Sequence, residues 1–352
     1  MGRPRRRKPP GMLVHEQYRK CIAFLCLPDA KTGWKPVGTA FFVWIAAGET
    51  GAPPTVGDPR VLYLVTARHV VEGARRFGPL YVRLNRRETD GTEFAQIDSD
   101  AWFVAQDTDV AVVDVPPQIA DAFDIHFLRP TQVATAEVLS ERRVGPGDEV
   151  FFSGLFTSFP GAKRAEPLIR FGTISMMPNE PVRIENADKS KSSVEAFLVE
   201  ARSWGGQSGS PAFVFFPPDR QPGFLTMGKI NTTGDGELLV PDHEMPQLLG
   251  LVQGHFDLKA DVAFANDSYG SAHVPLNAGV AVVIPAQKIV DTLMEEELVE
   301  ARKQIEDERP AATADAGQGP EAADEFQRFE NLTDKLVKVP KRDVDEKREE
   351  ES

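Results

Sequence analysis

Residues 205–216 read GGQSGSPAFVFF, and this stretch decides the fold. Ser208 lies between Gly206 and Gly209, and an apolar run begins directly after Pro211. Because glycine lacks a Cβ, these two positions allow a tight turn that other residues resist. A serine on such a turn suits an exposed nucleophile, with the backbone N–H groups of Gly206 and Ser208 facing a developing oxyanion. A Gly/Ser turn between two ordinary strands has the same pattern, so the rest of the chain must decide between them.

Short apolar runs continue on both sides of this turn, from about residue 20 to residue 285. They are rich in Val, Phe, Ile and Leu, and clusters of Gly, Pro, Asn and Asp separate them, which is typical of antiparallel sandwiches and barrels. Long helical periodicity is nearly absent, whereas a parallel α/β sheet needs a helix after most strands. We therefore predict an all-β fold, with long surface loops at 48–60, 178–193 and 217–247. The runs that predict strands are CIAFLCL, TAFFVWIA, VLYLVTA, LYVRLN, AWFVA, VAVVDV, EVFFSGLF, AFLVEA, PAFVFF, LLGLVQGHF and AGVAVVIP.

Two further segments carry side chains suited to proton transfer. His69 follows the apolar run LYLVTA and begins the short helical stretch RHVVEGA. A general base needs an imidazole at the end of a rigid element, with one ring nitrogen open to the nucleophile. Asp109 precedes the run VAVVDV, where a carboxylate can be drawn inside to orient that imidazole. A lone His is often a satisfied surface or core residue, and an Asp at a strand start is often a turn residue, so neither pattern decides alone.

Taken together, T-A-x-H, D-x-A-x-x and G-x-S-G-x-P occur in this order with domain-scale gaps. The chain thus resembles the trypsin-like (chymotrypsin-fold) serine peptidases, whose site residues follow in the order His, Asp, Ser. Within the second motif the match favours Asp109 over its rival Asp107. The likeness covers about residues 14–293, because further segments resemble strands of the family. These are GTAFFV at 38–43, VGPGDEV at 144–150, SG at 153–154, FGTIS at 171–175, LGLV at 249–252 and GVAVVIP at 279–285.

The resemblance implies two antiparallel six-stranded β-barrels that meet near residues 130–145, with the site in the cleft between them. His69 and Asp109 then come from the first barrel and Ser208 from the second. In such a serine endopeptidase, Ser208 attacks a peptide carbonyl, His69 takes and returns the proton, and Asp109 holds the ring. The N–H groups of Gly206 and Ser208 form the oxyanion hole. No cofactor is implied, and the substrate is a polypeptide.

The chain departs from the digestive branch of this family in three ways. Gln207 stands where those enzymes carry an Asp that pairs with a newly cut N-terminal amine, and no Ile/Val-Val-Gly-Gly start appears. We therefore expect activity without N-terminal cleavage. Ser210 replaces a glycine after the nucleophile, as in the glutamyl-endopeptidase branch, and the family's cysteine pairs are missing. The closing strand resembles bacterial heat-shock-type members, although no PDZ-like domain follows it.

Register with the family also indicates a substrate pocket. Arg202 lies six residues before the nucleophile, near the floor of the primary pocket, and Gln253, Gly254 and His255 lie along its wall. Cationic side chains there favour an acidic residue before the cleaved bond. The alternative is that Arg202 points outward to solvent.

Composition limits the remaining classes of function. The net charge of −13 argues against a nucleic-acid partner, and the basic segment 1–13 is short enough to be a disordered, solvated tail. Cys21 and Cys26 are the only cysteines, and their apolar surroundings predict buried thiols in a reducing, cytoplasmic location, not metal ligands. No apolar run approaches the about 18 residues that a membrane helix needs, and no cleavage site for an export signal follows the basic start. H-E-x-x-H, P-loop and G-x-G-x-x-G motifs in a strand–helix setting are missing, which argues against a metal or nucleotide enzyme.

After residue 285 the apolar residues recur at helical spacing. They predict one helix over about 286–307. The peptidase domain is predicted to end at residue 293, and 294–308 form a helical extension beyond it. The segment 309–352 contains the low-complexity run RPAATADAGQGPEAA and predicts a partly disordered tail. Within it, a short amphipathic helix over 322–338 is a candidate for docking a partner protein through Phe326, Phe329, Leu332 and Leu336.

A function of another class is also compatible with these patterns. A catalytically inactive protease-like module would bind peptides or partner proteins without cleaving them. The presence of His69, Asp109, Ser208 and Gly206 argues against it, because a decayed site usually loses one of these groups.

Overall fold

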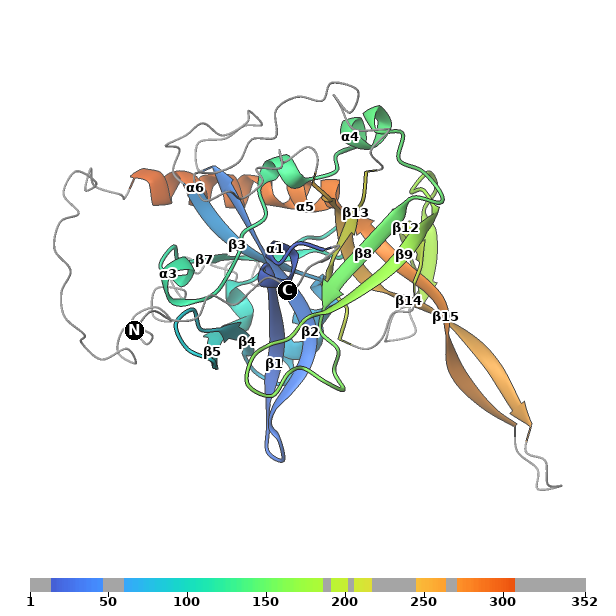
Figure 1. Ribbon diagram of the computed structural model, residues 1–352, viewed down its shortest axis with the longest axis horizontal. Coiled ribbons are helices and arrows are strands. Elements are labelled where there is room, and N and C mark those ends of the chain that lie inside the picture. Colours follow the sequence, from blue (N-terminus) through green and yellow to red (C-terminus); the bar gives the residue numbers. More distant parts are fainter. Residues whose placement is uncertain are drawn as a thin grey trace, which may run out of the picture.

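The computed structural model describes residues 14–46, 60–185, 191–201, 206–216, 245–263 and 271–307. These residues form two β units that lie side by side, with two helices across one end (Figure 1). The predicted helix at 322–338, with its four docking residues Phe326, Phe329, Leu332 and Leu336, lies outside the described residues, as do the segments 1–13 and 309–352. The all-β class is confirmed, because strands build both units and the helices are short.

The first unit is an antiparallel sheet of seven strands in the order β5-β4-β1-β2-β3-β7-β6. Six strands are predicted here, and the additional strand is β5, at one edge of the sheet. β5 has a mixed sequence, TEFAQI, that buries only Ala95 and Ile97 fully, while β6 contains two residues. The strands are β1 (Ile22–Asp29), β2 (Gly33–Ala46), β3 (Arg60–Thr66), β4 (Leu80–Asn85), β5 (Thr92–Ile97), β6 (Phe103–Val104) and β7 (Ala111–Val115).

The second unit is a closed barrel of six strands in the order β12-β15-β14-β13-β8-β9, as predicted. Closure leaves none of these six strands as an exposed sheet edge along the barrel wall. The strands are β8 (Glu149–Gly154), β9 (Leu168–Met176), β12 (Phe197–Glu200), β13 (Pro211–Val214), β14 (Gln247–Ala263) and β15 (Ser271–Pro285).

Side chains of the second barrel alternate between two cores. In β8, Phe151 packs into the core shared with the first unit, whereas Phe152 fills the barrel interior. In β14, Leu251 likewise packs into the shared core and Val252 into the barrel interior. Because both faces of these strands are buried, the strands read as unbroken apolar runs, and the sequence predicts them well for this reason.

The predicted loop at 178–193 is partly wrong. It contains an antiparallel hairpin of β10 (Val182–Glu185) and β11 (Lys191–Val194). The described side chains of this hairpin are exposed or half-buried, and apolar and polar residues alternate only over the short run VRIE, so the sequence marks the hairpin weakly. β14 and β15 also remain paired as far as Ala263 and Ser271, and Figure 1 shows this end of the pair projecting from the barrel.

The helices are short and connect or flank the strands. The prediction of one helix over 286–307 is corrected, because the structure has two helices separated at Met294 and Glu295. Arg302 supplies a physical reason for the break: its guanidinium donates to the carbonyl O of Leu293 at 2.7 Å and so satisfies the end of the first helix. The helices are α1 (Gln17–Lys20), α2 (Arg68–Arg75), α3 (Ile119–Ala122), α4 (Ala136–Glu141), α5 (Ala286–Leu293) and α6 (Glu296–Asp307), with 3₁₀ turns at Ser99–Ala101 and Pro130–Gln132.

Arg302 also joins α6 to the first unit. Its side chain is 1% exposed, and it donates a hydrogen bond of 3.2 Å to the hydroxyl of Tyr63 on β3. The guanidinium carbon lies 5.9 Å from the centre of the same ring. The last described helix is therefore fastened to a strand near the start of the chain.

The loop between β8 and β9, residues 155–167, belongs to the second unit but is bound to the first. Arg83 on β4 donates to two of its carbonyl groups at 3.1 and 2.9 Å, and Asn85 on the same strand makes a reciprocal pair of hydrogen bonds of 3.0 and 2.7 Å. The partners in the loop are Pro160, Gly161 and Ala165. Burial lowers the pKa of Arg83, and its hydrogen bonds to carbonyl groups offset part of that cost.

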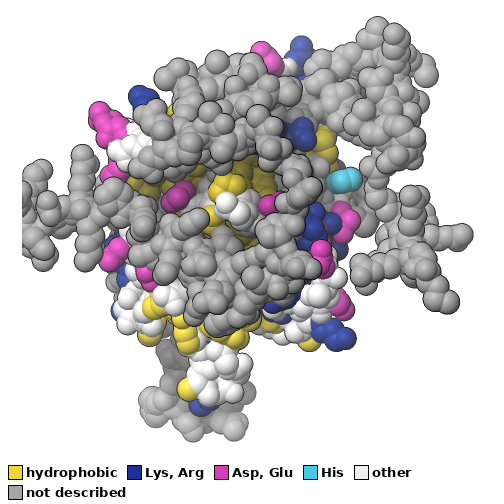
Figure 2. Space-filling model, turned by 90° about the vertical axis from the view of Figure 1, so that its left-hand side faces the viewer, with side chains coloured by type: hydrophobic (Ala, Val, Ile, Leu, Met, Phe, Trp, Pro, Cys, Tyr) yellow, Lys and Arg dark blue, Asp and Glu magenta, His cyan; other side chains and the backbone are white. Residues whose placement is uncertain are grey.

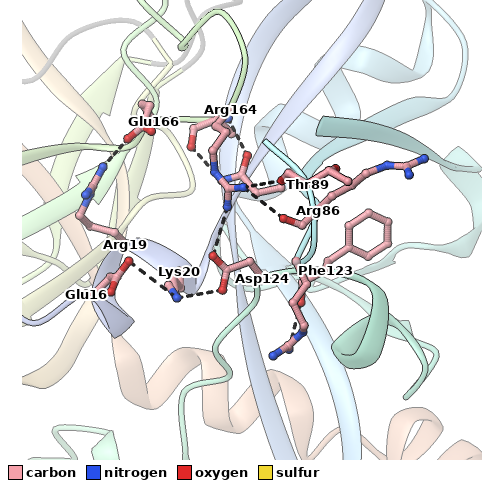
Figure 3. A network of polar contacts seen from close by, with 12 residues as sticks. Glu16, Arg19, Lys20, Arg86, Thr89, Phe123, Asp124, Arg164 and Glu166 are labelled. Atoms are coloured by element: carbon pink, nitrogen blue, oxygen red, sulfur yellow. Dashed lines mark hydrogen bonds and ion pairs between the residues drawn. The ribbon is translucent and has the colours of Figure 1, made fainter. Parts of the chain in front are cut away.

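Arg164 makes the central contact of this loop with the first unit, as Figure 3 shows. Its guanidinium donates to the carbonyl groups of Arg86 and Thr89, each at 3.1 Å, and pairs with Asp124 at 3.1 Å. Asp124 also pairs with Lys20 at 2.9 Å. The loop 155–167 is thus held by several elements of the first unit at once.

Burial of Cys21 and Cys26 is confirmed, and both thiols are free. Burial raises the pKa of Cys26 to about 12 and raises that of Cys21 as well, so both remain protonated. On the face turned to the viewer in Figure 2, Lys and Arg side chains are interspersed with Asp and Glu around a group of hydrophobic side chains. Within the described part of the chain, no helix is both long enough and apolar enough to cross a bilayer.

Candidate active site

His69 is the second residue of α2, which starts two residues after the end of β3. The strand is almost entirely buried up to Thr66, so it fixes the place at which the helix begins. The imidazole side chain is 45% exposed, whereas its neighbour Val70 is buried. A rigid strand end therefore presents the ring to solvent on one side.

Asp109 meets His69 through both carboxylate oxygens. Oδ2 lies 2.8 Å from His69 Nδ1, and Oδ1 accepts the backbone N–H of His69 at 2.9 Å. The Asp109 side chain is 4% exposed, because it lies just ahead of the buried strand β7. Asp107 is exposed, and Asp109 is the carboxylate that contacts His69. An acceptor at Nδ1 places the ring proton there and leaves Nε2 as a base.

The pKa of His69 is raised above its ordinary value of 6.5. Burial, the largest single influence, acts to lower it, but the hydrogen bond and the negative charge of Asp109 outweigh burial. Glu72, one turn further along α2, raises the pKa of His69 further, and Arg68 partly opposes this. The carboxylate thus stabilises the protonated form of the His69 ring.

We predict that activity requires His69 to be neutral and is therefore lost as pH falls through its raised pKa, above 6.5. Glu72→Gln removes a charge that raises this pKa, so the acidic limb of the kcat/KM profile should move to lower pH. Because Glu72 is half-exposed, the difference between the two proteins should shrink at high salt. Profiles of kcat/KM against pH at two ionic strengths measure both effects. A limb that moves to higher pH in the variant would contradict the assignment of His69.

Ser208 lies in a turn that four backbone hydrogen bonds fix. Its carbonyl accepts the N–H of Thr39 at 2.9 Å, and Gly209 donates to the carbonyl of Val252 at 2.8 Å. Ser210 completes the turn by donating to Gln207 at 2.9 Å and accepting from Val252 at 2.8 Å. Strands β2 and β14 thus hold the turn from opposite sides.

The structure brings this turn to the place where α2 begins. Gly38 lies between Val70, the residue after His69, and the turn of Ser208. A Cβ built on Gly38 would lie 2.7 Å from Cγ1 of Val70 and 3.5 Å from the carbonyl O of Ser208. A Cβ at Gly209 would lie 2.4 Å from Oγ1 of Thr66. The two predicted halves of the site therefore meet across the contact between the units.

The hydroxyl of Ser208 donates to the carbonyl of Gln253 on β14 at 3.0 Å. Within the described residues, no hydrogen bond joins this hydroxyl to Nε2 of His69. The backbone N–H groups of Gly206 and Ser208 also make no hydrogen bond to another described residue. Within the described residues, the two backbone donors are thus without a partner, whereas the hydroxyl is held by Gln253.

Two glycines of the turn have positive φ angles that make a side chain unfavourable. Gly206 has φ +95°, and a Cβ there would lie 2.6 Å from Cγ2 of Thr157. Gly209 has φ +85°, and a Cβ there would lie 2.0 Å from the carbonyl O of Thr39. The G-x-S-G pattern is therefore required by this backbone.

The predicted pocket residues divide into two groups. Arg202 lies outside the described residues. Gln253, Gly254 and His255 lie on β14 where its pairing with β15 shifts register, and all three are half-buried. Of these three, Gln253 contacts Ser208, because its backbone carbonyl accepts the hydrogen bond of the serine hydroxyl. Among the described residues, no group of three or more His, Cys, Asp or Glu side chains is arranged to hold a metal ion.

Sequence reasoning missed the part that Thr39 and Thr66 play in this site. The segment at 38–43 is noted only as a strand, yet Thr39 contacts the turn of Ser208 and Thr66 donates its hydroxyl to the carbonyl of Thr39 at 2.7 Å. The available signal was a threonine at or near the end of an apolar run, TAFFVWIA for Thr39 and VLYLVTA for Thr66, because a buried hydroxyl needs a hydrogen-bond partner.

Comparison with known proteins gives one family match. The family model described as a trypsin-like peptidase domain matches residues 39–214 of this chain. No curated protein matches the sequence. Among solved structures, the chain is similar to the Rv3671c protease of M. tuberculosis in its active form, with 16% identity, a TM-score of 0.39, and coverage of 78% of this chain and 80% of that chain. It is also similar to the Drosophila Grass clip serine protease of the Toll pathway, with 14% identity, a TM-score of 0.39, and coverage of 82% and 73%.

Proposed function

Because the chain belongs to the family of trypsin-like peptidase domains, we propose that it is a serine endopeptidase that works through His69, Asp109 and Ser208. The observation that carries this proposal is the contact of the buried Asp109 with Nδ1 of His69 at 2.8 Å, beside the turn of Ser208. A buried carboxylate that orients a half-exposed imidazole serves little purpose in a passive binding surface, whereas a general base needs it.

The reaction follows from the positions of these groups. Ser208 Oγ bonds to the peptide carbonyl carbon, its proton passes to Nε2 of His69, and the carbonyl electron pair moves to oxygen. The N–H groups of Gly206 and Ser208 bind that oxyanion. Its collapse breaks the C–N bond, and the leaving amine takes the proton from His69. Water then repeats the sequence on the acyl-enzyme and releases the acid.

The hydroxyl of Ser208 must first leave the carbonyl of Gln253. Rotation about the Cα–Cβ bond of the serine suffices for this, and hydrogen bonds between catalytic groups often form only once substrate is bound. The carbonyl of Gln253 is then available to accept an N–H group of the substrate chain. Substrate binding and the turning of the nucleophile are thereby linked.

The proposal is tested by labelling the full chain with a fluorophosphonate probe and mapping the modified residue by mass spectrometry. We expect one adduct, on Ser208, and hydrolysis of a casein substrate by the same preparation. An unlabelled protein that binds peptides without cleaving them would support the alternative, an inactive protease-like module.

Activity without N-terminal cleavage is part of the same proposal. Gln207 is 1% exposed and carries no charge, so it offers a new N-terminal amine no carboxylate to pair with. The intact mass of the labelled species decides this point. If only an N-terminally shortened form carries the probe, the zymogen-free part of the proposal is wrong.

We further propose that the pocket beside Ser208 prefers an acidic residue before the cleaved bond. Its support is the half-buried His255 on β14, together with the sequence position of Arg202. Peptide libraries should then give a higher kcat/KM for Glu or Asp at this position than for Leu or Lys, and Arg202→Ala or His255→Asn should reduce the difference. A preference for aliphatic or basic residues would contradict the assignment.

The proposal also includes the cellular compartment in which the protein works. Two free, buried thiols support a reducing compartment such as the cytoplasm. A partner protein that docks through Phe326, Phe329, Leu332 and Leu336 remains a proposal from the sequence alone.

A further inference from the structure

Every polar group of Thr39 is engaged, although the residue is fully buried. Its N–H donates to the carbonyl of Ser208 at 2.9 Å, and its carbonyl accepts the hydroxyl of Thr66 at 2.7 Å. Its own hydroxyl donates to the carbonyl of Gly206 at 2.7 Å and accepts the N–H of Leu155 at 2.9 Å. One side chain and its backbone thus connect three other segments of the chain.

These three segments carry the parts of the proposed site. Thr66 ends the strand that leads to His69, while Gly206 and Ser208 supply the two oxyanion donors. Leu155 begins the loop 155–167, which is bound to the first unit through Arg83, Asn85 and Arg164. Thr39 therefore lies where the two units and the turn of the nucleophile meet.

We propose that Thr39 is a positioning residue for the oxyanion hole, and that its hydroxyl holds Gly206 in the orientation that aims the N–H of this glycine at the substrate. This inference rests on the proposed function. The juxtaposition that carries it is the chain of hydrogen bonds from Leu155 N–H to Thr39 Oγ1 to the Gly206 carbonyl.

Gly206 needs such a partner because its backbone is intrinsically free. Glycine populates positive and negative φ about equally, so the φ of +95° is not fixed by the residue itself. Side-chain atoms of Thr157 and Leu155 fill the space that a Cβ at Gly206 would need, and the hydroxyl of Thr39 anchors the carbonyl of this glycine. Without that anchor the peptide groups on either side of Gly206 can rotate, and the N–H donor loses its direction.

The test compares Thr39→Val, which keeps the shape of the side chain and removes the hydroxyl, with Thr39→Ser, which keeps the hydroxyl. For Thr39→Val we expect kcat/KM to fall by roughly 10- to 100-fold, less than the loss of a whole donor. A peptidyl aldehyde, which forms a tetrahedral oxyanion on the serine, should lose affinity by the same factor. Binding of the same peptide as a non-covalent amide, measured in the Ser208→Ala background, should be unchanged. Thr39→Ser should restore kcat/KM and aldehyde affinity to near the wild-type values.

Thr292→Val is the matched control, because Thr292 is also a buried threonine and donates its hydroxyl at 2.7 Å to Lys288 within α5, away from the site. Its Tm should fall while its kcat/KM stays unchanged. If Thr39→Val does not fold, Thr39→Ser is compared with Thr39→Cys instead, because these two side chains differ only in the oxygen or sulfur atom. The Cys variant should then have the lower kcat/KM and the lower aldehyde affinity. Equal aldehyde affinity in wild type and the hydroxyl-free variant overturns the inference. A wild type that neither hydrolyses peptides nor takes up the probe overturns the proposed function as well.

Discussion

Ser208→Ala is expected to lower kcat for peptide hydrolysis by roughly 10⁶-fold, the size of loss that removal of the nucleophile causes in such sites. No described neighbour can replace it. Ser210, two residues further on, is fully buried, and its hydroxyl has no hydrogen-bond partner among the described residues. The residual rate should come from the oxyanion donors and from substrate binding. Burst-phase kinetics with an activated ester measure both the acyl-enzyme and the steady-state rate.

Ser210→Ala is the matched control for this variant. It removes the same atom from the same turn, but that atom makes no hydrogen bond within the described residues. We expect a burst and a kcat close to those of wild type. If Ser210→Ala loses the burst and Ser208→Ala keeps it, the nucleophile has been assigned to the wrong serine.

Asp109→Asn is expected to lower kcat by roughly 10⁴-fold, which corresponds to about 5.5 kcal/mol of transition-state stabilisation. The amide has the size of the carboxylate, so the backbone contact with His69 can persist. Its NH₂ group, however, can donate to Nδ1 of the imidazole, which moves the ring proton to Nε2 and removes the base. The pKa of His69 should also fall, because the charge of Asp109 is among the causes that raise it. An NMR titration of the His69 ring measures the tautomer and the pKa together.

Asp107→Asn provides the comparison for this variant. Asp107 is exposed and lies two residues before Asp109, so its replacement changes the net charge equally while leaving the contact with His69 intact. We expect a kcat near that of wild type and an unshifted tautomer. A loss in Asp107→Asn as large as that in Asp109→Asn would show that charge near the site matters more than the hydrogen bond.

The sequence predicts the strands that are buried on both faces better than the half-exposed ones, and burial explains the difference. Strands such as β8 and β14 are covered on both faces and therefore consist of continuous apolar runs. β5 is half-exposed, and the described side chains of the hairpin of β10 and β11 are exposed or half-buried, so their composition resembles that of loops. The sequence does not predict that the C-terminal helix is divided in two, for another reason. The division depends on the contact of Arg302 with the carbonyl of Leu293, and helical periodicity does not reveal such a contact.

For the site, short motifs were sufficient to nominate His69, Asp109 and Ser208, because each lies beside a recognisable strand or turn. The contact of Asp109 with His69 joins residues 40 positions apart, and only the fold brings them to 2.8 Å. Thr39 was not nominated, since nothing in an apolar strand indicates that its one hydroxyl reaches a glycine 167 positions away. Residues that act through a hydrogen bond across the fold are therefore the ones that local patterns miss.

The fastening of Arg302 to Tyr63 has a consequence for the newly made chain. Tyr63 is 2% exposed in the finished protein, and Arg302 covers part of it. A nascent polypeptide that has been made only as far as α5 lacks that cover, so the first unit, although synthesised early, completes its packing around Tyr63 only once α6 has formed.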